Sequence, residues 1–136
     1  MKKTLNRILC ITLSLVMLLT LFSPADIAIF ASASVVESGK CGDNLTWSLD
    51  SNGTLTISGT GDMDDYNYYE APWYSYNSYI IEVVISDGVT SVGDYAFYVC
   101  RSLKSIALPA GLTSIGDYAF DRCNLTSIDL PAGLTS

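Results

Sequence analysis

Three cysteines are the most reactive side chains beyond residue 33: Cys41, Cys100 and Cys123. An odd number argues against a complete disulfide framework. A bond between Cys100 and Cys123 is geometrically conceivable, because they occupy the same position of the repeat described below. The chain has no histidine, so the thiols lack partners for the usual tetrahedral zinc set. We interpret Cys100 and Cys123 as small buried thiols that fill a core position.

No pattern typical of a catalytic site occurs in the sequence. Without histidine, the most common general base is absent. There is no G-x-S-x-G nucleophile elbow and no phosphate-binding glycine loop. No two carboxylates are placed by pattern as an acid and a base for sugar hydrolysis. The sequence therefore predicts a protein that is not an enzyme and uses no metal or other cofactor.

An acidic cluster, Asp62, Asp64 and Asp65, lies in the least patterned segment, Gly59–Tyr79. Carboxylate oxygens are the ligands that Ca²⁺ prefers. The cluster lacks the glycine and the glutamate that complete an EF-hand loop. We interpret it as a solvated acidic turn.

The same segment is the richest in aromatic residues. Tyr66, Tyr68 and Tyr69 are candidates for a surface that binds a protein or a glycan, because exposed aromatic rings anchor ligands at interfaces. The alternative is that the rings cover the core as part of a cap. We favour that alternative for Trp73 and Tyr74, and leave both open for the other three tyrosines.

Beyond this segment the chain repeats itself. Val89–Leu108 and Leu112–Leu130 are nearly identical, and Pro-Ala-Gly follows each. Cys100 and Cys123 are one period apart, and the second copy is then shorter by a single position. A fixed period of this kind, here about 22–23 residues, is the signature of a solenoid, in which each repeat forms one coil and buries its apolar face against its neighbours.

Apolar residues in each copy follow an L-x-x-I-x-L spacing, which predicts a short strand with one buried face and a mainly β fold. The return leg is too short for a full helix, so we expect a tight or 3₁₀ turn. Stacked coils place matching residues over one another at about 4.8 Å. The expected inward ladder pairs Phe97 with Phe120, Cys100 with Cys123, Leu103 with Leu125, Ile106 with Ile128, and Leu108 with Leu130.

The aromatic segment fits one period upstream of the first full copy. Counting back by the spacing between Cys100 and Cys123 places Tyr74 in the position of Phe97, and Trp73 in the position of Ala96. We therefore expect a degenerate coil there, whose large rings close the stack.

The repeat resembles a known family. The stretch L-T-S-I-G-D-Y-A-F-x-x-C-x-L-T-S-I-x-L-P is similar to the leucine-rich repeat of the BspA type, found in bacterial surface proteins and some parasitic protists. The resemblance covers Ile80–Ser136. Residues 38–63, followed by A-P-W-Y-S-Y, resemble the region that often precedes such repeats. The resemblance implies a cell-surface protein concerned with adhesion and with host or matrix contact.

A hairpin is predicted ahead of the coils. Leu45, Trp47 and Leu49 alternate with polar residues, and Asp50–Gly53 supplies a turn. We expect the apolar face of this hairpin to lie over the open end of the first coil as a cap. The preceding residues, Ser34–Gly39, are expected to be a mobile lead-in.

The segment 1–33 has the pattern of a signal peptide. A basic start precedes the apolar run Ile8–Phe22, which is long for the apolar part of a signal peptide and short for a membrane span. Ala-Ser-Ala, ending at Ala33, fits a cleavage site; an uncleaved anchor is the alternative. The expected organisation is a signal peptide at 1–33, a capping region at 34–79 and repeats at 80–136.

Charge narrows the range of partners. Residues 34–136 carry four basic and 13 acidic side chains, a net charge of −9. Such a surface repels nucleic acid and anionic lipid, so membrane contact is expected only through the signal peptide before cleavage.

The chain ends early in a third copy, after about two and a half coils. We therefore expect it to be the N-terminal fragment of a longer protein.

Stacked coils present a rigid surface whose outward side chains vary from coil to coil, while the inward ladder stays fixed. The leading hypothesis is a secreted or cell-surface, non-catalytic module for adhesion or protein interaction. Its partner would be an extracellular protein or a host or matrix surface, with a glycan also considered. The alternative is the recognition or scaffold arm of a larger extracellular enzyme, including one that acts on polysaccharide. The strand positions expected to face a partner are Lys104, Ser105, Ala107, Thr126, Ser127 and Asp129.

Overall fold

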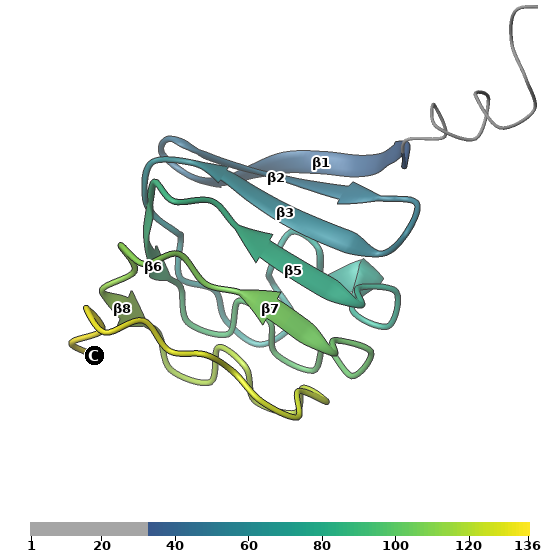
Figure 1. Ribbon diagram of the computed structural model, residues 1–136. Helices are drawn as coiled ribbons and strands as arrows, with labels where there is room; N and C mark the ends of the chain where they lie inside the picture. Colours follow the sequence, from purple (N-terminus) through teal and green to yellow (C-terminus); the bar gives the residue numbers. More distant parts are fainter. Residues whose placement is uncertain (1–32) are drawn as a thin grey trace, which may run out of the picture. The chain divides into compact units, whose positions relative to one another are not determined.

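The computed structural model describes residues 33–136, which form two sheets connected by tight turns (Figure 1). All of the predicted signal peptide except its last residue lies outside the described residues. One sheet has the strand order β1-β2-β3-β5-β7, and the other the order β4-β6-β8. The elements are β1 (Val35–Gly42), β2 (Leu45–Asp50), β3 (Thr54–Gly59), β4 (Gly61–Asp62), the 3₁₀ turn η1 (Tyr74–Tyr76), β5 (Glu82–Ile85), β6 (Val89–Val92), β7 (Ser105–Ala107) and β8 (Ser114–Ile115).

The predicted hairpin is confirmed: β2 and β3 are antiparallel, with Leu49 opposite Leu55. Its turn is closed by the Asp50 carboxylate, which accepts hydrogen bonds of 2.9 Å from the backbone N–H groups of Asn52 and Thr54. Gly53 has a φ of +82°, and a Cβ there would lie 2.6 Å from the Tyr79 carbonyl oxygen. The turn therefore requires glycine at this position.

The hairpin caps the coils in a way that differs from the expectation. It does not lie over the open end; β3 hydrogen-bonds in parallel to β5, with Leu55 opposite Val83 and Ile57 opposite Ile85 (Figure 1). The apolar residues of the hairpin thus continue the inward face of the coil strands. Pairing of this kind also satisfies the backbone groups along the edge of β5, which a lid over the end would leave unpaired.

The mobile lead-in expected at Ser34–Gly39 is wrong, because these residues belong largely to β1. This strand pairs antiparallel with β2, and Cys41 near its end is fully buried. Gly39 lies opposite Trp47, and a Cβ on Gly39 would come within 2.8 Å of the indole Nε1. Glycine makes room for the indole ring, so the strand lacks the apolar alternation that marks strands in a sequence.

Successive coils stack in parallel, as the repeat predicts. Val83 of β5 lies opposite Ile106 of β7, and Val92 of β6 lies opposite Ile115 of β8. The Phe97 ring stacks on that of Phe120, with centroids 5.5 Å apart and planes 4° apart. The fold is therefore a mainly β solenoid whose inward residues form ladders.

The first coil is out of step with the repeat period by one residue. Trp73, and not Tyr74, stacks on Phe97, with centroids 5.5 Å apart. The indole N–H donates a 2.7 Å hydrogen bond to the Ala96 carbonyl oxygen. The loop from this ring to the next inward residue, Ile80, is one residue longer than in the following coil, and η1 lies within it. Counting residues back from Phe97 therefore gave the wrong ring.

The ladder weakens in the last copy. Phe97, Cys100 and Leu103 are buried, whereas Leu125 is half-buried and Leu130 is 57% exposed. The structure assigns no strand to residues 124–130, although their pattern predicts one. The residue missing after Cys123 shortens the turn before this stretch, and only one side of it faces another coil. Ile106, Leu108, Phe120, Cys123 and Ile128 are each half-buried.

The outer turns of the coils are also joined by hydrogen bonds. The Asp94 carboxylate accepts a 2.6 Å bond from the backbone N–H of Asp117, and the Asp65 carboxylate a 2.9 Å bond from that of Asp94. In return, Tyr95 N–H donates to the Asp117 carbonyl oxygen at 2.9 Å. Asp65 and Asp94, each of which precedes a tyrosine, thus fasten their coils to the next one.

Replacing Asp94 tests this fastening. Asp94→Ala should lower the free energy of unfolding by about 1 kcal/mol, because the Asp117 N–H loses its acceptor. Asp94→Asn is the control, since an amide oxygen can still accept the bond. Urea denaturation measures both variants. An Asp94→Ala protein as stable as the wild type would show that the bond adds nothing.

The aromatic stack predicts an unequal pair of variants. Phe97 is fully buried between Trp73 and Phe120, so Phe97→Ala should cost about 3–5 kcal/mol through the cavity that it leaves. Phe120→Ala should cost clearly less, because that ring is only half-buried. Thermal unfolding followed by circular dichroism ranks the two. Equal losses would contradict the stacking order.

Candidate interaction surfaces

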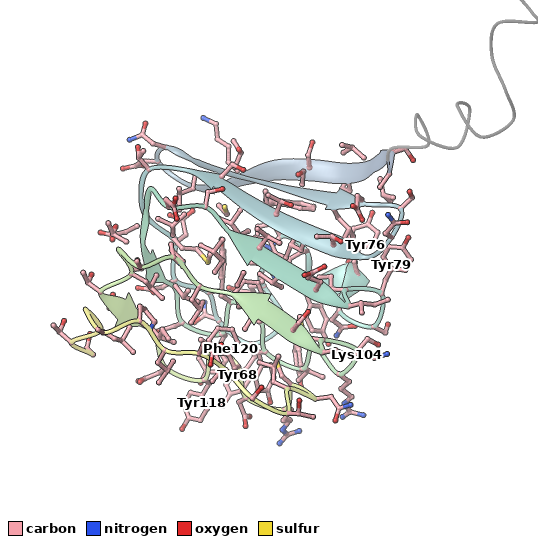
Figure 2. The ribbon with its side chains drawn as sticks, viewed as in Figure 1. Tyr68, Tyr76, Tyr79, Lys104, Tyr118 and Phe120 are labelled. Carbon is pink, nitrogen blue, oxygen red and sulfur yellow. The ribbon has the colours of Figure 1, made fainter. Side chains whose placement is uncertain are left out.

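The first candidate surface is the outward face of the sheet that carries β5 and β7. Lys104, Ser105 and Ala107 are exposed at β7, while Leu103 between the coils is fully buried. The Lys104 N–H donates to the Ile81 carbonyl oxygen at 2.8 Å, which fixes this end of β7 beside the previous coil. Figure 2 shows Lys104 at the start of that strand. Ser105 and Ala107 thus lie on the outward face of β7 by alternation, and Lys104 is exposed just before the strand begins.

The matching positions of the next coil lie on irregular chain. Thr126, Ser127 and Asp129 are all exposed, but no strand holds them. Upstream, the equivalent positions are Ile81, which is 43% exposed, and the exposed Glu82. The sheet face thus changes from apolar and acidic to basic and polar within one coil step.

Tyr66 does not join the other two tyrosines that the sequence singled out. Its ring is half-buried and meets the edge of Trp73, with centroids 5.8 Å apart. Its hydroxyl is buried with no hydrogen-bond partner in the described part of the chain. Burial raises the pKa of Tyr66 well above its ordinary value, and the nearby Cys41 and Asp64 raise it further. Tyr66 belongs to the core of the cap.

Tyr68 and Tyr69 are each 55% exposed and belong to a second candidate surface. They lie among tyrosines from the two following coils, and we call this set the tyrosine patch. Tyr68 is 4.6 Å from Tyr95 and 5.4 Å from Tyr98, between ring centroids. Tyr118 stacks on Tyr95 at 5.1 Å with planes 14° apart, and is 57% exposed. The patch consists of Tyr68, Tyr69, Tyr95, Tyr98 and Tyr118.

The backbone positions these rings through an unusual conformation. Tyr95 and Tyr118 have φ values of 52° and 56°, and Tyr69 has 68°. Positive φ is strained for bulky residues and turns the chain sharply. Tyr95 and Tyr118 hold the same place in both repeat copies, after Gly-Asp, which was the signal that sequence reasoning overlooked. The repetition of these two tyrosines is visible in the sequence, but their position at the surface is not.

One cation lies against the patch. The Arg122 guanidinium carbon is 5.8 Å from the Tyr98 ring centre, a cation–π distance. Arg122 also lies 3.7 Å from the Asp121 carboxylate, with its side chain 61% exposed. Tyr98 itself is only 6% exposed. Tyr98 therefore forms the floor of the patch, against which Tyr68, Tyr69 and Tyr95 pack.

The acidic cluster is used within the fold. The Asp62 carboxylate accepts a 2.6 Å hydrogen bond from the Thr90 hydroxyl, and Asp65 accepts from Asp94 as described above. A hollow of about 320 Å³ is lined in part by Asp43, Asp62 and Asp64. Across residues 33–136, no group of three or more cysteine, aspartate or glutamate side chains is arranged to hold a metal ion.

The three cysteines of the described region are free thiols. Cys41 and Cys100 are buried, and desolvation raises the pKa of each thiol to about 12. Cys123 is half-buried, with a pKa raised to about 11, and its thiol donates a 3.0 Å bond to the Phe97 carbonyl oxygen. All three therefore remain protonated near neutral pH.

Parallel coils with one short strand each and an inward apolar ladder define a leucine-rich repeat solenoid. Residues 72–136 match the family described as "BspA type Leucine rich repeat region (6 copies)", and this region of the chain is a BspA-type leucine-rich repeat. Repeats of this kind generally form protein-interaction modules. Within residues 33–136, no helix is both long enough and apolar enough to cross a membrane.

A solved structure is similar to the chain over a larger part of its length. It is the crystal structure of a leucine-rich repeat protein from Eubacterium ventriosum, with 28% sequence identity and a TM-score of 0.64. The match covers 73% of this chain and 33% of that one, so this chain spans about a third of the length of the other protein. No curated protein matches the sequence.

The buried thiols predict slow alkylation. At pH 8, iodoacetamide should modify Cys41 and Cys100 about a hundredfold more slowly in the native protein than in urea, because the thiolate is the nucleophile. The half-buried Cys123 should react at an intermediate rate. Peptide mass spectrometry resolves each site; native rates equal to those in urea would contradict the burial.

The raised thiol pKa also predicts a pH dependence of stability. Because the pKa of Cys41 in the folded protein exceeds the ordinary thiol value of 9.0, the free energy of unfolding should decline as the pH rises above 9.

Proposed function

We propose that the chain is a secreted or cell-surface, non-catalytic module that binds an extracellular protein of a host or matrix surface. The observation that carries the proposal is the continuous parallel sheet face, in which inward residues repeat and outward residues change. Repetition inside keeps the framework constant, while variation outside creates a particular binding surface. The signal peptide predicted at residues 1–33 supports export, and the BspA-type repeats support interaction.

The chemistry of the sheet face favours a partner with mixed character. Ile81 contributes exposed apolar area, Glu82 a carboxylate, and Lys104 an ammonium group one coil away. Ser105 and Ala107 are small and leave the backbone of β7 accessible. A protein surface offers apolar, cationic and anionic groups at such separations, and the small residues allow close approach.

Substitution at the centre of this face tests the proposal. Ala107→Arg adds a bulky side chain at β7, and should weaken binding to an immobilised matrix protein about tenfold by preventing close contact. Fibronectin, collagen and fibrinogen are the probes, with biolayer interferometry as the measurement. Lys40→Glu changes an exposed residue of β1, at the opposite edge of the same sheet from β7, and is the control.

Three outcomes test where the partner binds and whether it is a matrix protein. Binding that is lost in Ala107→Arg and kept in Lys40→Glu supports the sheet face. No loss in either variant would move the contact elsewhere on the molecule, and equal loss in both would show that the contact is not centred on β5 and β7. Failure of the wild-type chain to bind any of the three matrix proteins would remove this class of partner.

A further inference from the structure

The tyrosine patch forms a row that the protein-binding face does not use. Tyr68, Tyr95 and Tyr118 follow one another from coil to coil, with ring-centre distances of 4.6 and 5.1 Å. Figure 2 shows Tyr68 and Tyr118 on the same side of the molecule. The spacing follows the rise of about 4.8 Å between stacked strands. The surface therefore repeats a phenol group at the period of the solenoid.

We propose that this row binds a neutral, linear polysaccharide, with successive sugar units lying along successive coils. This inference goes beyond the proposed protein-binding function and does not depend on it. A polysaccharide repeats its hydroxyl groups at the length of one sugar ring, which is comparable to the coil rise. A tyrosine hydroxyl both donates and accepts hydrogen bonds. The Tyr68 and Tyr95 hydroxyls hydrogen-bond to each other, which leaves this pair one donor and further acceptor capacity for a sugar, and Tyr118 offers both kinds of partner.

The stacking of the rings favours recognition through their hydroxyls and edges. The faces of Tyr95 and Tyr118 lie against each other, with planes 14° apart, so neither of those two faces is open to a ligand. Tyr98 packs edge-on below Tyr68 and Tyr95, with interplanar angles of 80° and 78°. The row is thereby held rigid before any ligand arrives, which reduces the entropy lost on binding.

The turns that carry these rings repeat their backbone conformation. Tyr95 and Tyr118 both have positive φ, and so do Val99 and Arg122, a second equivalent pair later in the same two coils. The conformation therefore belongs to the turns of the coil. Its effect on the tyrosines is to place the two rings in the same direction, stacked with their planes 14° apart.

Charge decides between neutral and anionic ligands. Carboxylates flank the rings in the chain: Glu70 follows Tyr69, and an aspartate precedes both Tyr95 and Tyr118. The guanidinium against the patch is Arg122, and it already lies over Tyr98 beside Asp121. These carboxylates repel a polyanion but accept hydrogen bonds from sugar hydroxyls. A neutral polymer fits both conditions.

Affinity gel electrophoresis of the full chain tests the proposal. Native gels contain laminarin, soluble mannan or hydroxyethylcellulose as neutral polymers, and polygalacturonate as the anionic one. The wild type should be retarded by at least one neutral polymer. The triple variant Tyr68→Phe, Tyr95→Phe, Tyr118→Phe keeps the stacked rings and removes three hydroxyls. Its apparent affinity should fall about tenfold, because three hydrogen-bonding groups are gone.

Matched variants keep the outcomes distinct. Tyr79→Phe removes a hydroxyl that bonds to the Ser51 carbonyl oxygen in the cap, and should leave retardation unchanged. Tyr118→Asn suits the left-handed backbone and provides a second test if the triple variant unfolds. Retardation by polygalacturonate alone, by no polymer, or equally in wild type and Phe variants would overturn the proposal. Ala107→Arg should retain full retardation, so failure here is separable from failure of the protein-binding function.

Discussion

The register between neighbouring coils is the constraint on which the structure depends. Each coil contacts the next through parallel strand pairing, stacked apolar rings and cross-coil hydrogen bonds, and all three require the same offset. Val83 opposite Ile106, Phe97 over Phe120 and Asp94 to Asp117 satisfy it together. A shift of one residue would turn the inward side chains of a strand toward solvent. The contacts therefore support one another, and the register is fixed jointly.

The cap shows how the same constraint is met where the repeat pattern is absent. β3 pairs with β5 as though it were a coil strand, yet its other side is hydrogen-bonded antiparallel to β2. Trp73 supplies a larger ring above Phe97 and meets the edge of Trp47 at 5.8 Å. Larger rings fill the space beneath the hairpin, which has no return leg of its own. The sheet thus changes from parallel to antiparallel without a break in its inward face.

The sequence predicted the coils well because identical letters become spatial neighbours in a solenoid. Phe97 with Phe120 needed only the period, and the hairpin needed only alternation and a turn. The prediction failed where spacing changed or pattern was missing. Trp73 took the ring position because the loop before Ile80 is one residue longer, and β1 was hidden because Gly39 leaves space for Trp47. The sequence left the position of Tyr66 open, because letters alone do not separate its half-buried ring from its exposed neighbours.

The periodic residues of the solenoid repeat for different physical reasons. Phe97 and Phe120 repeat because a packed core admits little variation in volume. Asp94 repeats at Asp117 because its carboxylate accepts a backbone hydrogen bond from the next coil. Neither reason applies to Tyr95, which is half-buried, or to Tyr118, which is 57% exposed, because the two rings stack outside the core. Their stacking on each other accounts for part of this repetition, but packing does not require a row of phenol groups at the coil period. This repeated row of tyrosines lies at the surface, where it is accessible to a ligand.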